Sequence, residues 1–227
     1  PDLAMFDRFQ KWANGNIKIL TVAPERPGAM ELIKHAVTNG VMVSMGHHLA
    51  TDDDLERAVA AGASLCTHFG NGIPNEINRH NNPLWWLLAC DRISGMFITD
   101  GHHLPADLIK VALRSKGIDR FIVTSDASPL AGMPPGKYTI FKELPTVVDD
   151  TGLIYSEKTM SLAGSHSTIM ECMNYLASLD LLSENDLIKA GIINPLRAIG
   201  MKPDAVSKLQ GPAIKFSNGR FVFDTSF

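Results

Sequence analysis

The sequence predicts an α/β fold built on a parallel β-sheet. Short apolar, β-branched runs alternate with segments whose apolar residues recur at helical spacing. Polar residues, above all histidines, come directly after these runs, where parallel strands would end. The runs expected to form strands are 17–22, 41–45, 64–67, 93–98 and 121–124. This alternation indicates βα units and a parallel sheet.

The segments between the first strands carry helix signals. Residues 29–39 have apolar side chains at helical spacing and are followed by a glycine, which is typical of a helix end. Thr51 is a suitable N-cap, and the acidic residues 52–54 suit the positive end of the helix dipole. Pro105 is expected to open a further helix that runs to about residue 115.

The pattern changes after Asp126. A loop rich in proline and glycine follows, and residues 138–155 indicate a small β excursion with a turn at 150–152. Helices are then expected at 167–178, 183–190 and 195–199, and an isolated strand at 221–223. The sequence therefore divides into a larger α/β part, 1–205, and a short β tail, 206–227.

Composition excludes several classes of protein. The 227 residues are 45% hydrophobic and 20% charged, which is an ordinary globular mixture. The net charge of −3 is scattered without a basic stripe, so a nucleic-acid partner is not expected. No apolar run approaches the roughly 18 residues of a membrane-spanning helix, and no signal peptide is recognised. The three cysteines stand singly, which favours reduced thiols and a cytoplasmic location.

Histidine and aspartate follow four successive predicted strands. His47 follows the second strand, His68 the third, His103 the fourth and Asp126 the fifth. Because the carboxyl ends of parallel strands share one face, these side chains are expected on one rim. Imidazoles with a carboxylate suit zinc or iron, and the same set could perform metal-free acid–base chemistry. Any one of these histidines, taken alone, is equally compatible with a capping or loop role.

Short motifs, in unbroken order from about residue 10 to 200, identify a resemblance. They resemble segments of the N-acetylglucosamine-6-phosphate deacetylases, a family of the amidohydrolase superfamily. The motifs are Gly46-His47-His48-Leu49-Ala50-Thr51, Thr67-His68-Phe69-Gly70-Asn71-Gly72-Ile73-Pro74, Asp100-Gly101-His102-His103, Val123-Thr124-Ser125-Asp126-Ala127, Leu162-Ala163-Gly164-Ser165 and Asn194-Pro195-Leu196-Arg197-Ala198-Ile199-Gly200.

The resemblance implies a role for each matching residue. It implies that His47 and His68 bind a divalent metal ion, zinc or iron, and that Asp126 is the catalytic acid–base residue. It further implies that Arg79 reaches the sugar phosphate of the neighbouring subunit in a homodimer; a solvated loop residue is the alternative for Arg79. The residues implied to contact the amino-sugar substrate are Asn71, Gly72, His103, Leu162, Ala163 and Gly164.

The chain also departs from the family pattern. The family's first metal ligand is a glutamate in a His-x-Glu-Gly-Pro segment, and no such segment occurs here. Glu25 ends the first strand but is expected to be a structural carboxylate in a proline-flanked turn. The family fold is a (β/α)₈ TIM-type barrel of eight strands, whereas five are predicted here. We therefore expect a partial barrel that lacks N-terminal strands, with a remnant of a small β domain at its C-terminus.

Some of the remaining polar and sulfur-containing residues need no catalytic role. Cys66 lies close to His68 and is expected to be a buried packing thiol, His166 a helix-start residue, and His35 and His80 solvated. Three functions stay open: removal of the acetyl group from an N-acetyl amino sugar 6-phosphate, hydrolysis of a different amide, and a non-catalytic barrel fragment.

Overall fold

A parallel five-stranded sheet forms the centre of the protein. The computed structural model describes residues 1–141, 143–204 and 213–224. The strands lie side by side in chain order, and each neighbouring pair is parallel. They are β1 (Ile19–Val22), β2 (Met42–Met45), β3 (Leu65–Cys66), β4 (Ser94–Ile98) and β5 (Phe121–Thr124). The α/β class, the predicted strands and their parallel arrangement are confirmed.

Helices pack against one face of this sheet. They are α2 (Ala29–Thr38), α3 (Asp52–Ala60), α4 (Pro83–Ala89), α5 (Ala106–Lys116) and α6 (Ile169–Ser178). The predicted start of α3 is confirmed by a capping box, in which Thr51 Oγ1 accepts from the Asp54 N–H and the Asp54 carboxylate accepts from the Thr51 N–H. The helix predicted from Pro105 is confirmed as α5, with Pro105 as its N-cap, one position before the first turn.

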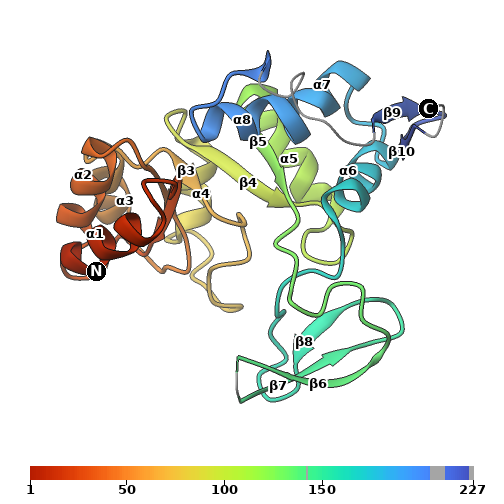
Figure 1. Cartoon of the computed structure of the whole chain (residues 1–227), viewed down its shortest axis with the longest axis horizontal. Coiled ribbons are helices and arrows are strands. Elements are labelled where there is room, and N and C mark those ends of the chain that lie inside the picture. The colour runs from red at the N-terminus through yellow and green to blue at the C-terminus, as the bar shows by residue number, and fades with distance from the viewer. Residues whose placement is uncertain (142, 205–212, 225–227) are drawn as a thin grey trace.

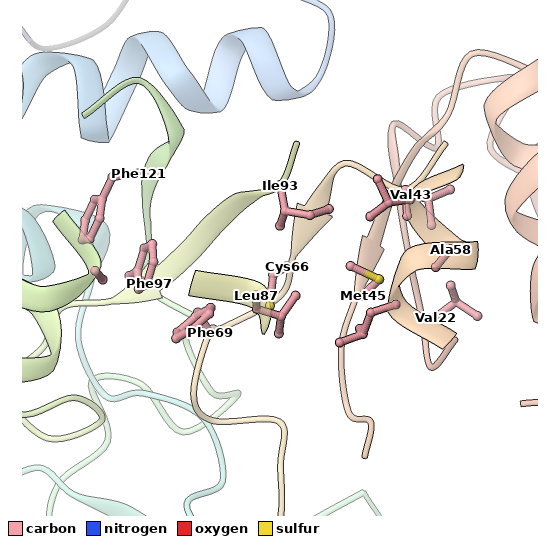
Figure 2. Packing of buried hydrophobic residues seen from close by; sticks show 14 of the residues in the cluster. Val22, Val43, Met45, Ala58, Cys66, Phe69, Leu87, Ile93, Phe97 and Phe121 are labelled. Atoms are coloured by element: carbon pink, nitrogen blue, oxygen red, sulfur yellow. The ribbon is translucent and has the colours of Figure 1, made fainter. Parts of the chain in front are cut away.

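The main core lies between the helices and the sheet. Figure 2 shows Val43, Met45, Cys66 and Phe97 in this layer, which they reach from three neighbouring strands. The ring of Phe97 stacks on that of Phe121, with 4.2 Å between their centroids. Burial in this layer raises the pKa of the Cys66 thiol to about 12, so its prediction as a buried packing thiol is confirmed.

A smaller apolar cluster covers the opposite face of the sheet. It contains Leu65 and Ile122, and Ala198 packs on them from α8 (Asn194–Ala198). The helix α7 (Glu184–Ile188) runs into α8 through the π-helical segment η2 (Lys189–Ile193). The separate helices predicted at 183–190 and 195–199 are therefore consecutive parts of one helical stretch.

The β excursion forms a three-stranded antiparallel sheet of its own. Its strands are β6 (Gly136–Ile140), β7 (Leu144–Val148) and β8 (Ile154–Ser156). It projects from the body of the molecule as a small lobe (Figure 1). Leu130, Ile140, Val148 and Ile154 form its core. The turn between β7 and β8 is held by the Asp149 carboxylate, which accepts from the backbone N–H of Leu153.

Two elements differ from the sequence prediction. An unpredicted helix, α1 (Leu3–Trp12), packs on α2, and the ring of His35 contacts Phe6 and lies 2.6 Å from Asp7 Oδ1; His35 is therefore paired and not simply solvated. The tail is a hairpin of β9 (Ile214–Ser217) and β10 (Arg220–Phe223), so the prediction of an isolated strand is wrong.

The hairpin is docked onto α6. The Asn174 side chain accepts from the backbone N–H of Phe221 and donates to its carbonyl oxygen, as a neighbouring strand would.

The predicted boundary between 1–205 and 206–227 lies outside the described residues. A short 3₁₀ turn, η1 (Ile118–Arg120), precedes β5. In the described part of the chain, no helix combines the length and hydropathy needed to cross a membrane.

Candidate functional site

Three candidate site residues stand at the ends of strands in an unusual backbone conformation. His47 follows β2 with a φ of 53°, His68 follows β3 with a φ of 29°, and Asp126 follows β5 with a φ of 48°. Residues other than glycine rarely adopt positive φ, and such strained positions cluster at functional sites. The backbone is thus turned at three strand ends on the same edge of the sheet.

The rings of His47 and His68 meet face to edge. Their Nε2 atoms are 2.8 Å apart and their ring planes are inclined by 83°. In this arrangement one nitrogen donates a hydrogen bond and the other accepts it. The Nδ1 atom of His68 is buried without a hydrogen-bond partner among the described residues. The predicted metal-binding pair is therefore brought together, with its Nε2 atoms converging on one point.

The electrostatics of His68 and of the neighbouring His48 favour uncharged rings. Burial lowers the pKa of His68, and the neighbouring His47 lowers it further, while Asp126 acts in the opposite direction. Burial also lowers the pKa of His48, against the effect of Glu25. Neutral imidazole is the form that binds metal ions.

Gly72 allows the loop after His68 to pass close to both rings. A Cβ at this position would lie 2.8 Å from the backbone N of His47 and 2.8 Å from Cε1 of His68. The Gly72 carbonyl accepts from the backbone N–H of His48 at 3.0 Å. The loop is therefore fastened across the histidine pair. Asn71, the residue before Gly72, lines a pocket together with both histidines.

The fourth strand contributes His103 together with a residue that the sequence reasoning did not assign to the site. The Asp100 carboxylate accepts from Nδ1 of His103 at 2.7 Å, and both side chains are almost fully buried. It also accepts from the hydroxyl of Ser165 at 2.9 Å. The short spacing from Asp100 to His103 was visible in the sequence, but Ser165 lies 65 positions further on, so no local signal could have found it.

The predicted substrate segment 162–164 lies against the strand end that carries Asp126. The backbone N–H of Ser165 donates to the Asp126 carbonyl at 2.8 Å, and the Ser165 carbonyl accepts from the Ser128 N–H at 2.8 Å. Gly164 has a φ of 78°, and a Cβ there would lie 2.9 Å from the Asp126 carbonyl oxygen. Glycine is therefore required at this contact.

These residues line a pocket of about 840 Å³ at the carboxyl ends of the strands. Such a volume is ordinary for a small-molecule site. The predicted site residues among its lining are His47, His68, Asn71, Gly72, His103, Asp126, Leu162, Ala163 and Gly164. Glu25 also lines the pocket, and its carboxylate accepts from the backbone N–H of Leu49 at 3.1 Å. Glu25 thus supports the loop after β2 from a position on the rim.

Arg79 is the one predicted site residue that the structure does not bring to this pocket. Its side chain is exposed, in the loop that leads to α4. Its backbone carbonyl accepts from Nε1 of Trp85 at 2.8 Å. His80 beside it is exposed, as expected. His166 precedes α6, as expected, and its Nε2 lies 3.1 Å from the Met133 carbonyl.

The donor set fits a divalent metal in part. The converging Nε2 atoms of His47 and His68 supply two nitrogen donors, whereas Nδ1 of His68 lacks, among the described residues, the hydrogen-bond partner that usually orients a ligating ring. Within 1–141, 143–204 and 213–224, no three His, Cys, Asp or Glu side chains form a group able to hold a metal. Catalytic zinc sites usually have three protein ligands, so two of them are accounted for here.

Comparison with known proteins supplies relatives for this arrangement. No protein-family profile matches the chain. The chain is 31% identical over 194 residues to the N-acetylglucosamine-6-phosphate deacetylase of Lysinibacillus sphaericus, which covers 86% of this chain and 49% of the relative. It is 27% identical over 201 residues to the N-acetylgalactosamine-6-phosphate deacetylase of Escherichia coli O157:H7, covering 88% and 52% of the two chains.

A solved structure agrees. The fold superposes with a TM-score of 0.81 and 28% identity on the N-acetyl-D-glucosamine-6-phosphate deacetylase of Mycobacterium smegmatis, solved in complex with N-acetyl-D-glucosamine-6-phosphate; 88% of this chain and 53% of that chain are covered. The chain spans about half the length of the curated relatives it matches. The resemblance predicted from the motifs is thus confirmed: most of this chain is similar to about half the length of N-acetylglucosamine-6-phosphate deacetylases.

Proposed function

We propose that this chain carries part of the active site of a metal-dependent hydrolase that removes the acetyl group from an N-acetyl amino sugar 6-phosphate. The observation that carries the proposal is the convergence of the His47 and His68 Nε2 atoms beside Asp126 in one pocket. The relatives' names indicate the substrate class, with N-acetylglucosamine-6-phosphate as the first candidate and its galactosamine epimer as the second.

His47 and His68 would hold the metal, for which zinc and iron are the candidates. When bound, a divalent metal supplies an activated water and polarises the amide carbonyl. Asp126 would accept the proton of the attacking water and return it to the nitrogen of the departing sugar amine. The turned backbone at Asp126 supports this role, because it aims the side chain from the end of β5 into the pocket.

The remaining pocket residues would orient the sugar. Asn71 and Gly72 lie beside the histidine pair, and His103 and the segment 162–164 line the same pocket. Such contacts accelerate the reaction by holding the amide in position, and not by taking part in bond making. Arg79 would bind the phosphate of a sugar held by the other subunit of a homodimer; its exposure outside the chain's own pocket supports that assignment over a contact within one chain.

The resemblance also bears on the complete fold and on the location of the protein. The five-stranded sheet would be part of a (β/α)₈ barrel, and the β9–β10 hairpin a remnant of a small β domain. The free cysteines Cys66, Cys90 and Cys172 support a reducing compartment, for which we propose the cytoplasm. Neither a nucleic acid nor a membrane is proposed as a partner.

One observation favours a second candidate function, a non-catalytic binding module. Among the described residues the site offers two metal ligands where three are usual. A module of this kind would keep the pocket and bind an amino sugar phosphate without hydrolysing it.

Metal loading followed by an acetate-release assay tests the proposal. We expect this chain, loaded with Zn²⁺ or Fe²⁺, to release acetate from N-acetylglucosamine-6-phosphate, with a smaller rate for the unphosphorylated sugar. The Asp126→Asn variant is the matched control for contaminating activity. A chain that binds one metal ion yet releases no acetate from either epimer or from the unphosphorylated sugar would overturn the proposal and leave the binding module.

A further inference from the structure

Asp100 is buried at the end of β4 and has no role in the proposed reaction. Its carboxylate takes part in four hydrogen bonds. Oδ1 accepts from the backbone N–H of His102 and of His103, each at 2.9 Å. Oδ2 accepts from Nδ1 of His103 at 2.7 Å and from Oγ of Ser165 at 2.9 Å. One carboxylate thus fastens its own turn, a pocket histidine and a distant segment.

The protonation state of this carboxylate follows from its surroundings. Burial by itself would raise the pKa of Asp100, but the hydrogen bonds from the His103 ring and from the backbone N–H groups outweigh it and hold the pKa well below its usual range. The group is therefore ionised at neutral pH. An ionised carboxylate has no proton to donate and only accepts hydrogen bonds.

This requirement decides where the His103 proton resides. Since Asp100 can only accept, Nδ1 of His103 must carry the hydrogen in their 2.7 Å contact. In a neutral ring Nε2 then has a free lone pair and accepts hydrogen bonds. His103 lines the 840 Å³ pocket, so Nε2 is the ring nitrogen available to a ligand there.

We propose that Asp100 is a positioning residue, which fixes His103 in the Nδ1-protonated tautomer so that Nε2 accepts a hydrogen bond from a donor group of the pocket ligand. The donor would be a hydroxyl or an amide N–H. A ligand that presents only acceptors at this point would be disfavoured, because the buried Asp100 holds the proton on the far side of the ring. The identity of the ligand as an amino sugar rests on the proposed function; the tautomer does not.

Ser165 extends this arrangement from β4 to the end of β5. Its hydroxyl donates to Asp100, and its backbone N–H donates to the carbonyl of Asp126. Ser165 therefore joins the support of His103, through its side chain, to the strand end that carries Asp126, through its backbone. We expect this link to keep the histidine and the aspartate at a constant separation, which a positioned acid–base site requires.

The tautomer is measured directly by NMR. In uniformly ¹⁵N-labelled protein at a pH near 8.5, above the ordinary histidine pKa of about 6.5, long-range ¹H–¹⁵N spectra distinguish protonated from bare ring nitrogens. The His103→Gln variant assigns the signal. We expect His103 to show a protonated Nδ1 and a bare Nε2, whereas exposed His80 shows a mixture. A protonated Nε2 on His103 in the unaltered protein would overturn the proposal.

The Asp100→Asn variant should reverse the tautomer. The amide oxygen is needed by the two backbone N–H groups, so the amide nitrogen faces His103 and donates to Nδ1, which moves the ring proton to Nε2. The Ser165→Ala variant, which keeps the carboxylate, should retain the original tautomer. If Asp100→Asn folds and its His103 signal is unchanged, Asp100 does not set the tautomer.

Kinetics separate this proposal from the proposed function. In a catalytically active protein, Asp100→Asn should raise KM about tenfold or more while changing kcat less, because Nε2 then presents a hydrogen to a donor. A merely structural role would lower the fraction of folded enzyme and leave KM unchanged. A protein with the expected tautomer but no acetate release would contradict the proposed function and leave the role of Asp100 standing.

Discussion

The two sides of the candidate pocket differ in how well their polar groups are satisfied. On the side of β2 and β3, two imidazole Nε2 atoms face each other and Nδ1 of His68 has no partner within the described residues. On the side of β4 and β5, the Asp100 carboxylate accepts four hydrogen bonds, and Ser165 links it to the Asp126 backbone. The β2–β3 side therefore keeps a buried nitrogen without a hydrogen-bond partner, whereas the polar groups of the β4–β5 side are joined by hydrogen bonds.

The difference indicates a division of labour. Buried polar atoms without partners are costly and uncommon, and the unpartnered Nδ1 of His68 leaves its ring without a protein group that fixes it. A connected network restrains its members and serves positioning. We therefore expect changes on the histidine side to affect metal binding, and changes on the aspartate side to affect turnover and substrate orientation with the metal retained.

Removal of either histidine of the pair should have the largest effect. We expect His47→Ala and His68→Ala to lose stoichiometric metal and, with it, all measurable acetate release, because each removes one of two nitrogen donors. His80→Ala, in an exposed loop, is the matched control and should bind metal normally. Elemental analysis after gel filtration measures the effect. One metal ion per chain in both site variants would show that the pair is not the metal site.

Replacement of the aspartate tests the other side of the comparison. Asp126→Asn preserves shape but cannot accept a proton at neutral pH, so kcat should fall about 10²–10⁴-fold while the metal content stays unchanged. Steady-state kinetics and elemental analysis of the same preparation provide both readouts. A nearly normal kcat would assign Asp126 a structural role at the rim, and a loss of metal would place it with the histidines.

The strand ends of this site could be predicted from the sequence because their signals are local. Apolar runs followed by a histidine or aspartate indicated the rim, and Thr51 as N-cap before the acidic residues 52–54 indicated the start of α3. The link from Asp100 to Ser165 joins residues far apart in the chain, and its role in orienting His103 depends on a tautomer. Neither property leaves a local pattern.

The missed elements lack periodic burial. Only Phe6 is buried in α1, and the other large apolar side chains of the helix, among them Phe9 and Trp12, are exposed. In β9, Phe216 alone is partly buried, and the strand is recognisable only from its pairing with β10 and its contact with α6. The hairpin thus depends on tertiary contacts, which single-sequence patterns do not record, whereas α1 has a local signal, the Asp2 N-cap, that the sequence prediction did not use.

The Arg79→Ala variant tests whether the sugar phosphate is bound by a residue outside the pocket of its own chain. A charged hydrogen bond to phosphate contributes about 1.5–3 kcal/mol, or roughly 10–100-fold in binding. Arg79→Ala should therefore raise KM by about that factor for N-acetylglucosamine-6-phosphate and leave the unphosphorylated sugar almost unchanged. Arg114→Ala, which removes an arginine from α5, is the control. Equal losses for both sugars would mean that Arg79 supports its loop and does not meet the phosphate.

The contribution of Asp100 to the free energy of unfolding should depend on pH in a defined direction. The folded-state pKa of Asp100 lies below its unfolded value of about 3.9, so its ionisation stabilises the fold above that pH. This contribution is lost as the pH falls from about 4 through the folded pKa. At pH 7, Asp100→Asn should lower the free energy of unfolding by about 1–3 kcal/mol, because hydrogen bonds to a buried charge are replaced by weaker ones.

Urea unfolding at a series of pH values measures this difference. The gap between the unaltered protein and Asp100→Asn should be constant from pH 7 to about 5 and should narrow towards pH 3, as the unaltered protein loses its advantage. Asp91→Asn is the control: its carboxylate pairs with Arg120 at the surface with a side chain 78% exposed, so its removal should cost less than about 1 kcal/mol. A gap that stays constant down to pH 3 would show that the ionised carboxylate does not stabilise this side, and the contrast between the two sides of the pocket would then rest on geometry alone.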